Sequence, residues 1–147
     1  MNWNLKAFDT LSVQELYAIL KVRVDVFVVE QNCPYPELDD KDKLAQHLFL
    51  TNEKGEVIAY CRLLPQNVSF KEVSIGRVLV NPNFRKQDFG RELLQKALDV
   101  LNEQKERAIK IEAQYYLRNF YASFGFEECS EPFLEDGIKH VEMLRKN

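Results

Sequence analysis

Two periods of hydrophobic and polar residues run along the chain, and the helical period predicts two long helices. Ser12 with Glu15 three residues later has the spacing of a capping box. An apolar stripe at helical spacing then predicts a helix over about residues 12–29, formed by Leu16, Ile19, Leu20, Val24 and Phe27. The pattern over residues 90–102 predicts a second helix more strongly than the first, because apolar residues share one face and charged residues line the other.

The remaining pattern predicts strands joined by short turns. Strands are expected at residues 3–8, 46–51, 56–64, 73–80, 108–113, 129–134 and 139–145, and a short helix at 117–124 ends at Gly125. Residues 31–45 contain prolines and acidic residues and are expected to form a loop. The order β-α-β-β-β-α-β-α-β-β indicates an α+β fold. We expect one mixed sheet flanked by helices, with parallel neighbours only around the central strand-helix-strand run.

Composition narrows the class of protein. A chain of 147 residues that is 46% hydrophobic and 29% charged has the make-up of a folded globular domain, so we expect one domain over residues 1–147. The net charge of −3 disfavours nucleic acid as a partner, because phosphate binding needs a basic excess. No apolar run is long enough to predict a membrane span.

Cysteine and histidine positions give no metal or disulfide pattern. Cys33, Cys61 and Cys129 are an odd number with no close pair, and His47 and His140 are far apart in sequence. The first residues also lack the basic-then-apolar design of a secretion signal. We therefore expect no metal, and a cytoplasmic protein that is a monomer or a homodimer.

The segment from Val78 to Leu94 carries the strongest chemical signal. A buried strand ends, a short basic loop follows, and a helix begins with Gly90 on its packing face. Unpaired N–H groups at a helix start attract anions, and Arg85, Lys86 and Arg91 add positive charge. The alternative is a solvated helix start that is basic by chance.

This segment resembles the acetyl-CoA-binding motif of the GNAT superfamily of N-acetyltransferases. That motif reads Arg/Gln-x-x-Gly-x-Gly/Ala after a strand, with Arg85 first and Gly90 last; Asp88 and Lys86 replace glycines that are usual in the family. The resemblance implies that acetyl-CoA is the acyl donor. It also implies the cofactor contacts Val78, Leu79, Val80, Arg85, Lys86, Gln87, Asp88, Phe89, Gly90 and Arg91.

A second segment, residues 117–126, resembles the aromatic-Tyr-x-x-x-Gly-Phe stretch of the same superfamily. The resemblance implies that Tyr121 protonates the departing CoA thiolate, a task suited to a phenol. It also implies cofactor contacts at Gln114, where the family often has Asn, and at Asn119. The alternative for Tyr121 is a helix aromatic that packs in the core.

Residues 23–35, 75–78 and 135–140 resemble the ElaA-like branch of the superfamily. The GNAT fold implies that strands 73–80 and 108–113 separate and that pantetheine lies between them, bonded to the backbone of Val78 and Val80 like an added strand. The acceptor would enter from the opposite side. The candidate residues of that side are Glu30, Tyr35, Arg62, Arg77 and His140. An amine must lose a proton before it attacks, and either Glu30 or water could act as the base.

The resemblance implies an acetyl-CoA-dependent N-acetyltransferase. A primary amine of a small molecule or peptide would attack the thioester directly in a ternary complex. Two alternatives stay open: an enzyme like the acyl-homoserine-lactone synthases, whose early sequence resembles Arg23, Phe27 and Glu30, and a noncatalytic CoA-binding domain. The acidic loop, with Glu37, Asp39, Asp40 and Asp42, hints at a cationic acceptor, although such loops are often simply solvated.

Overall fold

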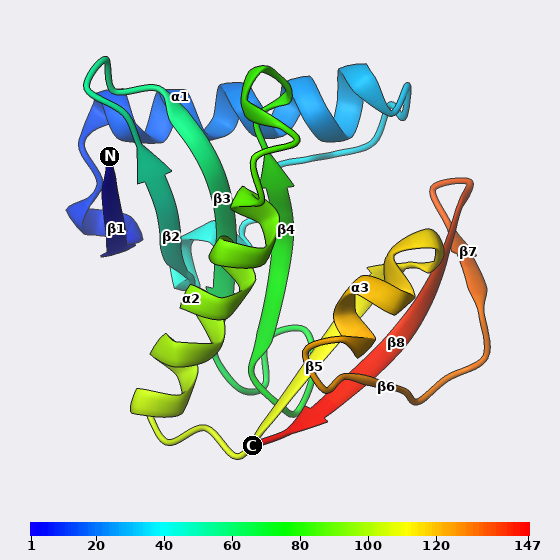
Figure 1. The fold of residues 1–147 in the computed structure, drawn as a ribbon. Helices are drawn as coiled ribbons and strands as arrows, with labels where there is room; N and C mark the ends of the chain where they lie inside the picture. Colours follow the sequence, from blue (N-terminus) through cyan, green and yellow to red (C-terminus); the bar gives the residue numbers. More distant parts are fainter.

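The computed structural model describes residues 1–147, which form two antiparallel sheets that diverge from each other (Figure 1). The strands of the first sheet, in spatial order, are β1 (Asn2–Ala7), β2 (Gln46–Thr51), β3 (Val57–Leu64) and β4 (Ser74–Val80). In the second sheet, β8 (Ile138–Lys146) pairs with β5 (Ala108–Gln114), β6 (Glu127–Glu128) and β7 (Phe133–Glu135). The sheets meet at one parallel bridge, between Val73 and Ile109.

Three α-helices accompany the sheets. The first, α1 (Val13–Val24), begins with both hydrogen bonds of the capping box between Ser12 and Glu15, and continues into a π-helical segment, η2 (Asp25–Glu30). The others are α2 (Phe89–Glu103) and α3 (Arg118–Ala122). Short 3₁₀ turns complete the chain: η1 (Phe8–Thr10), η3 (Lys41–Leu44), η4 (Pro82–Phe84) and η5 (Tyr115–Leu117).

Helices α1 and α2 cover opposite faces of the first sheet, because the strands of this sheet carry apolar side chains on both faces. Ile19 and Val22 of α1 pack with Phe49 on one face, whereas Leu48 and Leu50 face the core that contains α2. That larger core also includes the alternate β5 residues Ile109, Ile111 and Ala113, together with Val141, Met143, Tyr121 and Phe126. The β5 residues between them, Glu112 among them, therefore point to the other face of the second sheet.

The predicted α+β class and element order are confirmed. The sheet differs in being divided, with the parallel pairing limited to one bridge. The strand expected at 129–134 is instead two short strands, β6 and β7, separated by a stretch that includes Pro132, which has no N–H to donate to a ladder. None of the helices has the length and apolar content needed to cross a bilayer.

Candidate active site

A cleft of about 1020 Å³ opens where β4 and β5 diverge. β4 is the edge strand of the first sheet, and beyond the bridge at Val73 its outer edge has no strand partner. The cleft is lined by these strands, the end of η2, the loop that follows η2, α3 and the turn between β7 and β8. An unpaired strand edge can bind an extended ligand through backbone hydrogen bonds.

A β-bulge shapes the cleft side of β4. Tyr60 pairs with Leu79 and Arg62 with Gly76, so β4 has one more residue than β3 in this interval. Arg77 lies within the bulge and has a φ of 51°, in the left-handed region that costs about 1–2 kcal/mol for a residue with a Cβ. Bulges redirect side chains, and here the Arg77 side chain reaches Glu37 on the neighbouring loop.

The loop between η4 and α2 presents a run of unpaired backbone donors. No backbone N–H from residues 85 to 91 donates a hydrogen bond within the chain. Lys86 and Asp88 adopt left-handed φ values of 65° and 63°, which vary the directions of these donors. At Gly90 an added Cβ would lie in ordinary contact, 3.7 Å from a methyl of Val80, so a larger side chain there would point at β4. Such a loop at a helix N-terminus suits an anion.

Two of the three basic residues near this loop have protein partners. Arg85 forms a bidentate ion pair with Glu30, at 2.6 and 2.7 Å, and its Nε donates to the Val80 carbonyl oxygen. Arg91 lies over the Phe124 ring at 4.6 Å and contacts Ser123 of the segment after α3. Only Lys86 of the three has no partner within the chain.

The ion pair bears on the predicted role of Glu30 as a base. The hydrogen bond from Arg85 lowers the pKa of Glu30, which makes its carboxylate a weaker proton acceptor. Glu30 lines the cleft, but its partner belongs to the basic loop and not to the expected acceptor side. The role of Glu30 stays a prediction.

Tyr121 lies on α3 with its ring packed edge-to-face against Phe120 and Phe126. The residue is 6% exposed and lines the cleft, and its hydroxyl makes no hydrogen bond within the chain. Burial raises the pKa of Tyr121 above its ordinary value of 10.0, so the phenol is protonated at neutral pH. The geometry therefore leaves a proton donor free to serve a ligand in the cleft.

Gln114, at the end of β5, exchanges two side-chain hydrogen bonds with Gln31, at 3.3 and 3.4 Å. This pair connects the second sheet to the residue that follows η2. A second connection runs from the Cys33 thiol to the carbonyl oxygen of Asp136, at 3.4 Å. The two contacts join the first half of the chain to the second across the cleft.

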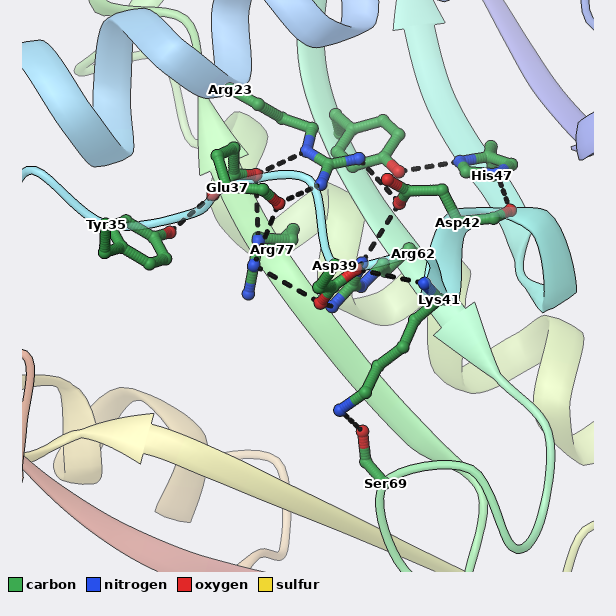
Figure 2. A network of polar contacts seen from close by, with 11 residues as sticks. Arg23, Tyr35, Glu37, Asp39, Lys41, Asp42, His47, Arg62, Ser69 and Arg77 are labelled. Atoms are coloured by element: carbon green, nitrogen blue, oxygen red, sulfur yellow. Dashed lines mark hydrogen bonds and ion pairs between the residues drawn. The ribbon is translucent and has the colours of Figure 1, made fainter.

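A buried ionic cluster, here called the arginine network, lies beside the bulge (Figure 2). It joins the guanidinium groups of Arg23, Arg62 and Arg77 to the carboxylates of Glu37, Asp39 and Asp42. Arg23, which is fully buried, contacts Glu37 and Asp42 at 2.7 Å each. Glu37 is shared with Arg77, at 2.8 Å, and Asp42 with Arg62, at 3.0 Å.

The arginine network balances its own charge, which buried ions require. Burial alone would raise the pKa of Asp39 and of Asp42, but the arginine hydrogen bonds and charges outweigh it and hold both pKa values below their ordinary range. Three of the four acidic loop residues thus point inward to arginines, and only Asp40 is exposed. The interpretation as a solvated segment is wrong for Glu37, Asp39 and Asp42, whereas the attraction for a cationic acceptor stays a prediction.

Three polar side chains of the second sheet form another group, here called the acid–histidine set. Glu112 of β5, Glu135 of β7 and His140 of β8 each offer one polar atom, and these atoms lie within 4.8 Å of one another. All three residues line the cleft. The sequence alone did not identify Glu112 or Glu135. The alternation of β5 was the available signal, because it places Glu112 on the same face as Gln114.

The structure brings most of the predicted site residues together at the cleft. Those that line it are Glu30, Tyr35, Arg62, Arg77, Val78, Leu79, Val80, Arg85, Gly90, Gln114, Tyr121 and His140. The others lie outside the lining, on the loop, at the start of α2 or on α3: Lys86, Gln87, Asp88, Phe89, Arg91 and Asn119.

Comparisons with known proteins identify relatives along nearly the whole chain. A family model described as an acetyltransferase (GNAT) domain matches residues 17–146. A UPF0039 protein of Schizosaccharomyces pombe is 44% identical over 94% of this chain and 92% of its own. The Escherichia coli protein ElaA is 38% identical over 99% of this chain and 97% of its own. An acyl-CoA N-acyltransferase structure from Pseudomonas aeruginosa has a TM-score of 0.93 and 37% identity, over 98% of both chains.

Two further solved structures resemble this chain in fold but have low sequence identity to it. A GNAT family acetyltransferase from Elizabethkingia anophelis, solved with acetyl-CoA bound, has a TM-score of 0.70 and 13% identity, over 99% of this chain and 97% of its own. The CoA-dependent acyl-homoserine lactone synthase BjaI, solved with SAM and isopentyl-CoA, has a TM-score of 0.80 and 15% identity, over 97% of this chain and 81% of its own.

Proposed function

The chain belongs to the GNAT acetyltransferase family, and from this premise we propose that it transfers an acetyl group from acetyl-CoA to a primary amine. One observation carries the proposal. The cleft runs along the unpaired edge of β4, near a loop whose N–H groups are unpaired, and it contains a buried tyrosine with a free hydroxyl. An extended thioester with a pyrophosphate at its far end fits this combination of features.

The donor side follows from β4 and α2. The pantetheine arm would hydrogen-bond to the backbone of Val78 and Val80, with Leu79 turned into the core. The pyrophosphate would accept hydrogen bonds from the N–H groups of residues 85–91, with Lys86 nearby as an unpaired cation. The acetyl-CoA held by the distant Elizabethkingia protein of the same fold supports this choice of donor. Gln87, Asp88, Phe89, Arg91, Gln114 and Asn119 are proposed as further contacts near the loop and α3.

The reaction would proceed by direct attack in a ternary complex. The amine nitrogen bonds to the thioester carbonyl carbon, the C–S bond breaks, and the thiolate takes a proton from the Tyr121 hydroxyl. Tyr35, Arg62, Arg77 and His140 would line the acceptor side. Glu30 or water would serve as the base in the simplest scheme, although the bond from Arg85 weakens Glu30 in that role.

Replacement of Tyr121 by Phe tests the proposal. The ring and its packing are kept, so we expect normal affinity for acetyl-CoA and a melting temperature close to that of the parent. Loss of the proton donor should lower the single-turnover acetyl transfer rate by about 10²–10⁴-fold. Mass spectrometry of a primary-amine pool incubated with acetyl-CoA supplies the acceptor and the readout. Tyr17→Phe, at an exposed tyrosine of α1 outside the cleft, is the control.

If the folded Tyr121→Phe protein binds CoA and transfers acetyl at the parental rate, Tyr121 is only a core aromatic. A second candidate function rests on the fold similarity to BjaI. Transfer of an acyl group from an acyl-CoA thioester to the amine of SAM, with release of CoA, in preference to acetyl transfer to other amines would favour it. Binding of CoA with no transfer to any amine would favour a noncatalytic domain.

A further inference from the structure

The acid–histidine set differs from the other charged groups near the cleft because its acids have no cationic partner. Glu112 and Glu135 form no ion pair, whereas the neighbouring Glu142 pairs with Lys110 at 3.1 Å. Lys139, the residue before His140, places its ammonium over the Tyr115 ring at 4.1 Å. Two unmatched carboxylates beside an imidazole thus face a cleft in which Glu30 and Asp39 are paired with arginines, and in which Asp136 is a further acid without an ion pair.

The histidine of this set has a fixed orientation. His140 Nδ1 lies 2.7 Å from the carbonyl oxygen of Ile138, and its ring stacks on Phe133. A carbonyl oxygen only accepts hydrogen bonds, so Nδ1 carries a proton, and it is Nε2 that can accept one. In its neutral form the ring adds Nε2 as an acceptor to the two carboxylates, and three acceptors match the three N–H donors of a primary ammonium.

A second observation, on the first sheet, also points to a ligand in the cleft. Arg62 is 3% exposed, lines the cleft, and its Nε is the one buried side-chain N or O atom without a hydrogen-bond partner. Gly76, which pairs with Arg62 in the β3–β4 ladder, places no side chain beside this Nε, since an added Cβ would lie 3.9 Å from it, in ordinary contact. A buried donor without a partner is costly, and a ligand oxygen that came within hydrogen-bond distance of this Nε would satisfy it.

We propose, building on the function proposed above, that the acid–histidine set binds the acceptor ammonium and that His140 Nε2 removes its proton. The acceptor class is a primary amine that also bears a carboxylate or carbonyl oxygen, which Arg62 Nε binds. The ammonium loses one proton to Nε2, and the freed amine rotates about its C–N bond and attacks the thioester. The nitrogen loses its second proton as the amide forms, and the thiolate gains one from Tyr121. The net reaction releases CoA, the amide and one proton to solvent.

The test compares β-alanine with n-propylamine, which lacks the carboxylate, as acetyl acceptors. We expect a kcat/KM at least tenfold higher for β-alanine. His140→Gln should lower kcat at pH 7 by about 10²–10⁴-fold without changing the Kd of acetyl-CoA. The loss should shrink as the pH rises, because more amine then arrives unprotonated. The carboxylates that lie within 4.8 Å of a His140 ring nitrogen are those of Glu112 from β5 and Glu135 from β7. Their Gln variants should raise the KM of β-alanine, whereas Glu127→Gln, on β6 outside the cleft, should not.

A parental kcat and pH profile in His140→Gln, with an unchanged β-alanine KM in both Glu variants, would overturn the proposal. Failure of the proposed function is separable, because β-alanine binding can be followed without turnover. In NMR spectra of the two histidine rings, β-alanine should shift the His140 signals and leave those of His47 unchanged. Absence of that shift, or a stoichiometric shift with zinc chloride alone, would show that the set is not an amine site.

Discussion

The pairing of Arg85 with Glu30 bears directly on cofactor affinity. Both side chains are about 40% exposed, so the pair contributes little to stability. The same guanidinium lies at the start of the loop that is proposed to receive the pyrophosphate. The Glu30 carboxylate accepts hydrogen bonds from both terminal nitrogens of Arg85, so a phosphate oxygen that is to bind these nitrogens must compete with it.

Glu30→Gln should therefore strengthen the binding of CoA. The variant frees Arg85 from a competing carboxylate. The interaction energy of an exposed ion pair is about 0.2–1 kcal/mol, so its loss in the free protein corresponds to a Kd of CoA up to about fivefold lower. Isothermal titration at low and high salt measures the effect, with Glu53→Gln in the β2–β3 turn as the control. Tenfold weaker binding would mean that Glu30 itself contacts the cofactor. A fall in kcat at unchanged Kd would restore Glu30 as the base.

Some of the residues at the cleft could be predicted from the sequence, and others could not. The basic loop and Tyr121 could be selected from sequence because motif spacing identified them, and Arg77 could be selected because a charged residue on a buried strand is unusual. The arginine network could not, because its acids lie on a loop whose pattern is that of a solvated segment. One signal was present: Arg23, Arg62 and Arg77 each interrupt an apolar element, and a buried arginine requires a carboxylate.

At the scale of elements, the start of α1 offers a direct test of a predicted feature. Ser12→Ala removes the hydrogen bond that the Ser12 hydroxyl accepts from the Glu15 N–H, at 3.0 Å. Such a change costs about 1 kcal/mol, and we expect the melting temperature to fall by about 2–4 °C for a chain of this size. Ser12→Asp should recover most of the loss, since aspartate also caps helices. Equal destabilisation by both variants would contradict the role of the cap.

Most elements were predictable because their periodicity is strong, and the departures have physical causes. The first helix continues to Glu30, but its end is π-helical: the Gln31 N–H bonds to the Val26 carbonyl, five residues back. The spacing of apolar residues at 3.6 per turn does not reveal a switch from α-helical to π-helical hydrogen bonding. The separation of the two sheets could not be predicted either. The residue patterns of β4 and β5 would be much the same whether the strands paired along their whole length or at a single bridge.

For the whole molecule, buried polar groups predict the dependence of stability on pH. Burial is the main cause that lowers the pKa of His47 from its ordinary value of 6.5. The unfolded chain therefore binds more protons than the folded protein below about pH 6.5, so stability falls as the pH falls. Asp39 and Asp42 have pKa values depressed from 3.8, and the stability they contribute is lost as the pH falls below about that value.

We expect the melting temperature to decrease in two stages on acidification, the first below about pH 6.5 and the second below about pH 4. Differential scanning calorimetry between pH 7.5 and 3 measures both stages. His47→Gln should be less stable at pH 7.5, because it loses contacts to Tyr60 and to the Asp42 carbonyl. It should nevertheless lack the first stage, and an unchanged first stage would assign it to another group.

The arginine network also has a consequence for how this cleft can diverge among relatives. Arg23, Arg62, Glu37 and Asp42 are buried against opposite charges, so removal of one of these charges leaves others unpaired and destabilises the fold by several kcal/mol. Glu112 and Glu135 are exposed and form no ion pair, so their replacement costs little stability. Substitutions that change the preferred acceptor are therefore expected to accumulate on the second sheet, while the residues of the arginine network stay the same.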